Sequence, residues 1–228
     1  MKNIIKIIND DCLKILPNLD KKVDLIITDP PYWISYQSNR RKKKLKKIMN
    51  DINKKKTIDL IKKCLEYFYI ILNNNRSIYL FVHRKVLDKI KPIFEKYFKL
   101  KNIIIWQKNN HWSGDLKGSY APKYEMILYW HKWKDYIRWK RLPDILYVPK
   151  VPPKKLLHPA QKPVELIDIF IEKSSDEWFF ILDPFLGSGT TAISALKHNR
   201  SIIWIEIDKE YYNIAKNRID DYIINFIL

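Results

Sequence analysis

Asp29, Pro30, Pro31 and Tyr32 directly follow a nearly continuous apolar run at residues 23–28. The two prolines fix a rigid, extended turn. The Asp29 carboxylate and the Pro30 carbonyl can both accept hydrogen bonds from one NH₂ group, and the Tyr32 ring can stack on another aromatic ring. The four residues therefore predict a site that holds an exocyclic amine for alkylation. A stiff loop with an aspartate cap is the structural alternative.

Gly187 and Gly189 form a second group that could bind a ligand. The chain has only 4 glycines, yet these are separated by a single residue. This spacing predicts backbone torsions or a close approach that a Cβ atom would forbid. The glycines lie between an apolar run at 178–182 and a helical pattern at 190–197, so N–H groups at a helix N-terminus can face a ligand. A tight turn is the alternative.

Two acids, Glu206 and Asp208, follow the next apolar run, residues 201–205. An acid at the end of this strand suits a ribose diol, as in dinucleotide-binding folds. The glycines do not form the full GxGxxG of a pyrophosphate site, because Ala192 stands at its last position. The pattern predicts a nucleoside ligand without a pyrophosphate. A helix-capping acid is the alternative.

These groups need a sheet to position them, and the hydrophobic pattern predicts one. Strands are predicted at 3–8, 23–28, 77–83, 103–107, 125–130, 178–182 and 201–205. Helices are predicted at 12–16, 57–72, 86–97, 163–172, 190–197 and 210–219. The fourth and fifth strands are expected to pair antiparallel, because no helical pattern lies between them. The alternation predicts a single α/β domain over 1–228, with a doubly wound, mostly parallel seven-stranded sheet and insertions.

The positive charge is concentrated in two segments. Lys and Arg exceed Asp and Glu by 43 − 25 = +18. Residues 40–56 hold ten bases and one acid, and residues 131–155 hold eight bases and two acids, which leaves 18 − 9 − 6 = +3 for the rest of the chain. This distribution predicts a polyanionic partner. A solvated loop is the alternative for either segment taken alone.

Other features exclude several classes of protein. No apolar stretch approaches the roughly 18–20 residues needed to span a bilayer, and the N-terminus has no signal-peptide pattern. The 2 cysteines, Cys12 and Cys64, cannot form a disulfide framework. The 5 histidines show no metal-ligand spacing, so no metal is expected. We therefore expect a reduced, cytoplasmic protein that is not bound to a membrane.

Four segments resemble the amino-methylating DNA methyltransferases, which use S-adenosylmethionine to methylate adenine N6 or cytosine N4. TDPPYWISYQSNRR resembles their catalytic motif, and LDPFLGSGTTAISALKHNRSIIWIEIDKEYYNIAKNRI resembles their cofactor motif with the next strand. HPAQKPVELIDIFI is similar to a segment that helps close the cofactor pocket, and NDDCLKILPNL to the opening strand and loop. The catalytic motif comes first, as in the permuted β class. Trp33 departs from the family pattern, in which a small residue is common, and puts the shape of the base pocket in doubt.

The resemblance implies a class I methyltransferase (Rossmann-like) fold and S-adenosyl-L-methionine as the cofactor. It implies that Asp29, Pro30, Pro31 and Tyr32 hold the target base. The residues implied to bind the cofactor are Asp11 and Cys12 at the adenine ring, Lys162 near the methionine carboxylate, Phe185, Gly187, Gly189 and Thr190 around the methionine and ribose parts, and Glu206 at the ribose hydroxyls, with Asp183 and Asp208 in the same site.

The two basic segments are interpreted as DNA-binding insertions. The loop at 33–57 is expected to contact phosphates, and the insertion at 131–157 to recognise the target, its aromatic side chains either stacking on DNA or forming a small core. The predicted DNA contacts are Arg40, Arg41, Lys42, Lys43, Lys44, Lys46, Lys47, Arg138, Lys140 and Arg141. The resemblance leaves a homodimer and a cognate restriction endonuclease open as further partners.

Together these features predict methyl transfer to the exocyclic N6 of adenine in a base flipped out of double-stranded DNA, in the nucleoid. The leading aspartate of the catalytic motif favours adenine, and cytosine N4 stays open. Methylation of RNA or protein is a weaker alternative, as is a non-catalytic DNA-binding protein on the same scaffold. No covalent enzyme intermediate is expected, since neither cysteine follows a proline.

Overall fold

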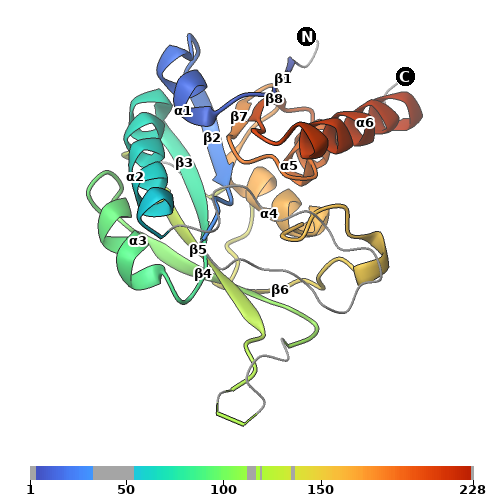
Figure 1. The fold of residues 1–228 in the computed structure, drawn as a ribbon. Coiled ribbons are helices and arrows are strands. Elements are labelled where there is room, and N and C mark those ends of the chain that lie inside the picture. Colours follow the sequence, from blue (N-terminus) through green and yellow to red (C-terminus); the bar gives the residue numbers. More distant parts are fainter. Residues whose placement is uncertain (1–3, 33–53, 112–116, 119, 135–136, 227–228) are drawn as a thin grey trace.

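One eight-stranded sheet forms the centre of the fold (Figure 1). The computed structural model describes residues 4–32, 54–111, 117–118, 120–134 and 137–226. The strands are β1 (Ile5–Ile8), β2 (Val23–Thr28), β3 (Leu72–Val82), β4 (Asn102–Gln107), β5 (Tyr124–His131), β6 (Ile145–Tyr147), β7 (Phe180–Asp183) and β8 (Ser201–Ile205), in the order β1-β8-β7-β2-β3-β5-β4-β6. Of these strands, β5 alone runs antiparallel to its neighbours, β3 and β4. This confirms the predicted α/β fold and the predicted antiparallel pair.

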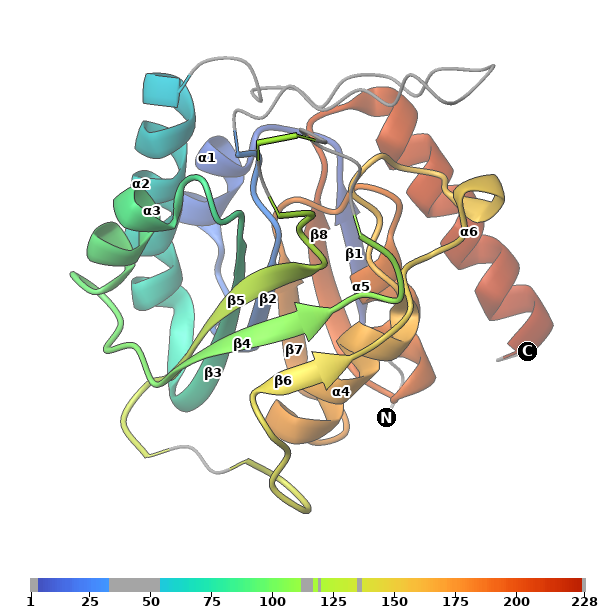
Figure 2. The same ribbon diagram turned by 90° about the horizontal axis from the view of Figure 1, so that it is seen from below.

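The prediction of seven strands was wrong by one strand. β6 lies inside the segment predicted as an insertion, and it pairs parallel with β4, Ile105 opposite Ile145 (Figure 2). Its three side chains are exposed, buried and exposed in turn. A strand of this length between Pro143 and Pro149 is too short for a hydrophobic pattern to indicate.

Helices cover both faces of the sheet (Figure 1). The α-helices are α1 (Cys12–Ile15), α2 (Lys54–Ile71), α3 (Leu87–Phe94), α4 (Val164–Ser174), α5 (Thr190–Lys197) and α6 (Lys209–Phe226), and the two 3₁₀ helices are η1 (Leu16–Asn18) and η2 (Pro153–Lys155). Residues of α1, α2 and α3 share one hydrophobic cluster with one face of the sheet, and residues of α4, α5 and α6 share the other.

Coverage of both faces explains the sequence pattern of the central strands. All residues of β2 except Asp24 are buried, because the side chains on both of its faces meet helices. On α2, Ile61, Cys64, Leu65 and Phe68 are buried at helical spacing, so one stripe of that helix faces the core. Within the described ranges, no helix is both long enough and apolar enough to cross a membrane.

The direction of β5 divides the molecule into two functional ends. We call the side where β2, β3, β7 and β8 finish the carboxyl end of the sheet, and the opposite side the amino end. Because β5 is antiparallel, the chain leaves it at the amino end, where Lys132 N donates to Arg76 O at 2.7 Å and Asn75 N to Lys132 O at 2.7 Å. β6 then returns the chain to the carboxyl end (Figure 2).

Candidate active site

The loops after β2 and β7 meet at the point where the winding of the sheet reverses. β2 pairs with β7 in parallel, Leu25 opposite Ile181. From β2 the chain crosses to β3 on one side, whereas from β7 it crosses to β8 on the other. In open α/β sheets, ligands bind outside the carboxyl ends of the strands at such a reversal. This geometry brings Asp29, after β2, close to Asp183, at the end of β7.

The glycine loop after β7 has the strained backbone that its sequence predicts. Gly187 has φ +55° and Gly189, the residue before α5, has φ +79°. A Cβ atom on Gly189 would lie 3.3 Å from the Cβ of Ala215, and one on Gly187 would lie 3.4 Å from the His158 ring. Both glycines are therefore needed for a left-handed turn packed tightly between α6 and the segment before α4.

Glu206, just after β8, accepts hydrogen bonds on both carboxylate oxygens. Gly187 N donates at 2.8 Å and Asp208 N at 2.9 Å. Burial raises the pKa of Glu206, and these two bonds oppose the shift. Asn9, which the sequence analysis did not single out, donates from Nδ2 to the Glu206 carbonyl at 2.7 Å and ties the end of β1 to this acid. A carboxylate fixed in this way can still accept from a diol, because each oxygen keeps a second lone pair.

Asp183 and Asp208, the other two acids predicted here, are both buried. Asp183 accepts from Phe185 N at 3.1 Å. Burial raises the pKa of Asp183 to about 7, and the nearby charges of Asp29 and Glu206 add to the shift. Asp208 accepts from Glu210 N at 2.9 Å and so caps α6. Asp208, which was predicted to bind the cofactor, is therefore a helix cap in the structure.

At the other side of this site, Asp11 caps α1 by accepting from Leu13 N at 2.9 Å. The Cys12 side chain is buried, with its Sγ 3.8 Å from Cys64 Sγ of α2. Only Asp11 of the predicted adenine-contacting pair therefore has a side chain outside the core.

In the loop after β2, side chains donate hydrogen bonds to both carboxylate oxygens of Asp29. Tyr32 OH donates to Asp29 Oδ1 at 2.6 Å, and Lys162 Nζ donates to Asp29 Oδ2. Pro30 and Pro31 are buried. Burial raises the pKa of Asp29, with Lys162 opposing the shift and Glu125 adding to it. A carboxylate withdrawn from water in this way is typical of a reactive site.

Lys162 was expected near the methionine carboxylate of a cofactor, but in the structure its ammonium lies on Asp29. It also donates to Ala160 O at 3.2 Å and forms an ion pair with Glu125 Oε2 at 3.4 Å. Glu125 Oε1 in turn accepts from Lys108 Nζ at 2.5 Å. No motif in the sequence indicates Glu125, although one signal exists: it is the only acid inside the apolar run of β5.

His158 also belongs to the site and was not singled out. Its ring lies edge-on to Tyr211, with 4.3 Å between ring centroids, and it packs against Gly187. Burial lowers the pKa of His158 to about 3, so the ring is neutral at physiological pH. Thr190 Oγ1 donates to Lys162 O at 3.2 Å. These contacts dock residues 158–162 onto the glycine loop.

The predicted DNA contacts fall into two groups. Arg40, Arg41, Lys42, Lys43, Lys44, Lys46 and Lys47 lie outside the described residues. Arg138 lies at the amino end of the sheet, where its guanidinium pairs with both oxygens of Asp176 at 2.7 and 2.8 Å. Lys140 and Arg141 are exposed nearby, and Lys173 Nζ donates to Lys140 O at 2.7 Å. The structure therefore does not bring these three residues to Asp29.

The described aromatic residues of this segment do not form a core. The side chains of Trp133, Trp139 and Tyr147 are 72%, 83% and 61% exposed. Among the described residues between 132 and 157, only Leu146 and Val148 are buried, and both pack against the sheet.

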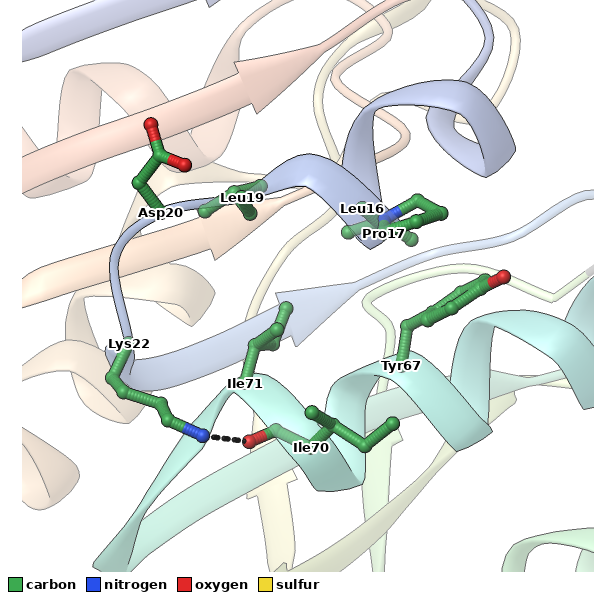
Figure 3. A pocket seen from close by; sticks show the side chains of 8 residues that line it. All are labelled: Leu16, Pro17, Leu19, Asp20, Lys22, Tyr67, Ile70 and Ile71. Carbon is green, nitrogen blue, oxygen red and sulfur yellow. Dashed lines mark hydrogen bonds between the residues drawn. The ribbon is translucent and has the colours of Figure 1, made fainter.

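A surface cavity of about 210 Å³ lies away from Asp29 and the glycine loop (Figure 3). It lies between η1 and the last turn of α2, where Lys22 donates to Ile70 O at 2.5 Å. Because Lys22 precedes β2, the cavity is at the amino end of the sheet, and it is not the candidate active site.

The fold defines a class of protein: a doubly wound α/β domain of the class I methyltransferase type, with its candidate ligand residues where the winding of the sheet reverses. A family model described as DNA methylase, N6_N4_Mtase, matches residues 23–217. The Type II methyltransferase M.HpaI of Haemophilus parainfluenzae is 30% identical, over 94% of this chain and 74% of its own length.

Solved structures agree with this match. The M1.HpyAVI–SAM complex superposes with a TM-score of 0.73 at 26% identity, over 95% of this chain and 100% of that chain. PvuII DNA methyltransferase, whose name calls it cytosine-N4-specific, shares the fold with a TM-score of 0.70 at 16% identity, over 97% and 92% of the two chains. The chain belongs to the N6/N4 DNA methylase family and is an S-adenosylmethionine-dependent DNA methyltransferase.

Proposed function

We propose that this enzyme methylates the exocyclic N6 of adenine in a base flipped out of double-stranded DNA. The observation that carries the proposal is the Asp29 carboxylate, largely withdrawn from solvent at the carboxyl end of β2 and fixed by Tyr32 and Lys162. Each of its oxygens keeps a lone pair for an incoming N–H. An aspartate in this position favours adenine, by the family resemblance.

The mechanism requires the amine nitrogen to expose its lone pair. That lone pair is delocalised into the purine ring, so the free amine is a poor nucleophile. Hydrogen bonds from the NH₂ group to Asp29 and to the Pro30 carbonyl favour a pyramidal nitrogen, and Tyr32 stacks on the base. A base inside a duplex cannot reach these groups, so it must leave the stack. Positioning for in-line attack then supplies much of the rate.

The residues present fit the cofactor. Glu206, with both oxygens fixed by backbone N–H groups, would hold the ribose hydroxyls, and Asp11 would contact the adenine ring. Gly187 and Gly189 let the loop approach closely, with Phe185 and Thr190 beside it. When bound, S-adenosylmethionine supplies a methyl group already activated as a sulfonium. The protein therefore has to orient the amine and exclude water, and needs no nucleophile of its own.

We further propose that DNA lies across the carboxyl end of the sheet. The described residues place several exposed bases there: Arg84 and Lys85 follow β3, Lys123 precedes β5, and Lys154 and Lys155 form part of η2. The basic loop at 33–57 starts directly after Tyr32 in the sequence, and most of it lies outside the described residues. The family resemblance also suggests two further partners to test, a second copy of this chain and a cognate restriction endonuclease.

The experiment is nucleoside mass spectrometry of unmethylated DNA incubated with the full chain and isotopically labelled cofactor. The proposal expects labelled N6-methyladenine from the wild type and none from Asp29→Ala. N4-methylcytosine alone would instead support the second candidate, a DNA cytosine-N4 methyltransferase. If the wild type binds DNA but transfers no labelled methyl group to it, the proposal that this protein methylates a DNA base fails.

A further inference from the structure

Asp29 lies at one end of a row of alternating charges that reaches β4. Lys162 joins Asp29 to Glu125, and Glu125 joins Lys162 to Lys108. All four side chains are largely withdrawn from solvent, with exposed fractions of 19%, 9%, 26% and 19% in order from Asp29 to Lys108. Two carboxylates and two ammonium groups balance, so the row carries no net charge.

Glu125 completes the surroundings of the Lys162 ammonium. That group has three N–H donors, and it has three oxygen neighbours: Asp29 Oδ2, Ala160 O and Glu125 Oε2. The Phe81 ring lies beneath it, 4.9 Å from Nζ to the ring centroid. A buried ammonium with every donor directed in this way cannot rotate freely, and it therefore fixes the carboxylate that it touches.

We propose that Glu125 is a positioning residue for methyl transfer, acting through Lys162 on the Asp29 carboxylate. This inference rests on the proposed function. Glu125 shares the ammonium of Lys162 and so keeps it from neutralising Asp29 completely, which leaves a lone pair of Asp29 Oδ2 available to the amine. Glu125 itself touches neither the base nor the cofactor in this scheme.

A purely structural ion pair with Lys108, at the base of the β4–β5 hairpin, is the competing explanation. The two explanations differ in what the charge of Glu125 does to Asp29. Glu125 raises the pKa of Asp29, whereas Lys162 lowers it. Removing the negative charge of Glu125 while keeping its size leaves Lys162 acting alone, so the pKa of Asp29 falls. A purely structural role predicts instead that Glu125→Gln lowers stability and leaves kcat at neutral pH unchanged.

Several titratable groups lie close enough to Asp29 and Glu125 to affect their pKa values. Lys162, Glu125, Tyr32 and Asp183 act on Asp29. Glu125 is faced by Lys108, Lys162 and His83. Because His83 is titratable and faces Glu125, a His83→Asn variant is needed to show that the acidic limb of the pH–rate profile belongs to Asp29.

The test measures kcat and KM for DNA between about pH 5 and 9 in the full chain with Glu125→Gln, which preserves shape. We expect kcat to fall about tenfold with KM within about twofold, and the acidic limb to move to lower pH by about half a unit or more. Glu125→Asp restores the charge and should return the limb toward the wild-type position. In Lys108→Gln, Glu125 keeps only Lys162 as an ion-pair partner, so the acidic limb should move to higher pH.

The matched control is Glu95→Gln, which removes the same charge from an exposed ion pair with Lys91 on α3, 2.8 Å long. It should leave rate and profile unchanged. An active wild type combined with an unmoved acidic limb in both Glu125→Gln and Lys108→Gln would overturn the positioning role, as would a limb that disappears in His83→Asn. A wild type without methyl transfer would instead overturn the proposed function, and this inference with it.

Discussion

At the amino end of the sheet, acids are surrounded by partners that stabilise their charge. Asp24, at the start of β2, accepts from Asn73 Nδ2, Arg76 Nε and Phe180 N at 3.0–3.1 Å. Asp176 is paired with Arg138, whose hydrogen bonds lower the pKa of that carboxyl. These acids join strands, helices and the segment after β5 to one another.

At the carboxyl end, three acids of the candidate site carry charge that burial opposes, whereas Lys162 and Lys108 lower the pKa of Glu125 beside them to about 2. Burial raises the pKa values of Asp29, Asp183 and Glu206, although each accepts at least one hydrogen bond. Keeping charge there costs free energy of folding, which is typical of residues retained for binding or catalysis. The same residue type thus supports the fold at one end of β2 and, in the proposed function, the chemistry at the other.

The two ends of β2 allow the largest test of this comparison. Asp29→Ala should reduce methyl transfer by about 10²–10³-fold or more, because the amine acceptor is removed. Its cost in stability should be smaller than that of Asp24→Ala, because burial opposes the charge of Asp29, although Lys162 loses one of its partners. Asp24→Ala should do the reverse: the free energy of unfolding falls by about 2–4 kcal/mol, since Arg76 loses its buried partner. Incorporation of labelled methyl groups and thermal denaturation measure both effects. Equal losses of activity and stability in the two variants would remove the distinction.

Stability as a function of pH should have opposite signs at the two ends. The folded pKa of Asp183, about 7, is above its ordinary value of 3.8. Its stabilising contribution is therefore complete below pH 4 and is lost as pH rises toward 7, a change of a few kcal/mol at about 1.4 kcal/mol per pKa unit. Asp183→Asn should flatten the fall in melting temperature over this range.

Asp176 is the matched case with a lowered pKa. Its contribution is present above its ordinary pKa and is lost as pH falls, so Asp176→Asn should weaken the protein at neutral pH and matter less in acid. Melting curves at pH 4, 5.5 and 7, on both variants and the wild type, compare the two. If Asp183→Asn leaves the slope of melting temperature against pH unchanged, folding does not raise the pKa of the Asp183 carboxyl.

Left-handed backbone provides a smaller comparison. Gly189→Ala should destabilise the protein by about 1–2 kcal/mol and weaken cofactor binding, since φ there is +79° and the added Cβ would press on Ala215. Asn199, in the turn before β8 at the amino end, has φ +57°. Asn199→Gly should be neutral or stabilise by up to about 1 kcal/mol, with cofactor affinity unchanged by calorimetry. A cofactor affinity that survives Gly189→Ala would contradict the close approach.

The smallest effect concerns DNA affinity. Lys154→Gln with Lys155→Gln, at the carboxyl end, should reduce the slope of log K against log salt by about 0.9 for each phosphate that the variant no longer neutralises. Lys140→Gln with Arg141→Gln removes the same charge at the amino end and should leave the slope unchanged. Fluorescence titration of duplex DNA at several salt concentrations measures both. A reduced slope in the second pair would place DNA at the amino end as well.

Much of the fold could be predicted because its signals are local. The predicted bounds of β2, α5 and β8 match the structure to the residue, since each ends at a residue that breaks its pattern. The candidate sites at Asp29 and Gly187 could be proposed for the same reason, as each lies in the loop that follows a buried strand.

What could not be predicted depends on contacts between distant segments. Lys162 and Glu125 meet only because β5 lies beside β3, which no local pattern encodes. The position of Arg138 follows from the direction of β5. An antiparallel strand delivers the next residues to the amino end, although their charge and aromatic content alone suggest the DNA surface.

The pairing of β2 with β7 also governs how the enzyme can be made. During synthesis on the ribosome, β2 to β6 emerge well before β7, so the edge of β2 that pairs with β7 is unpaired in the meantime. β1 stays unpaired for longer, because its partner β8 follows β7 in the chain. An open, apolar strand edge is a template for association with other chains. The nascent enzyme should therefore depend on chaperones until residue 205 has been synthesised, and cofactor added during translation should protect only chains near full length.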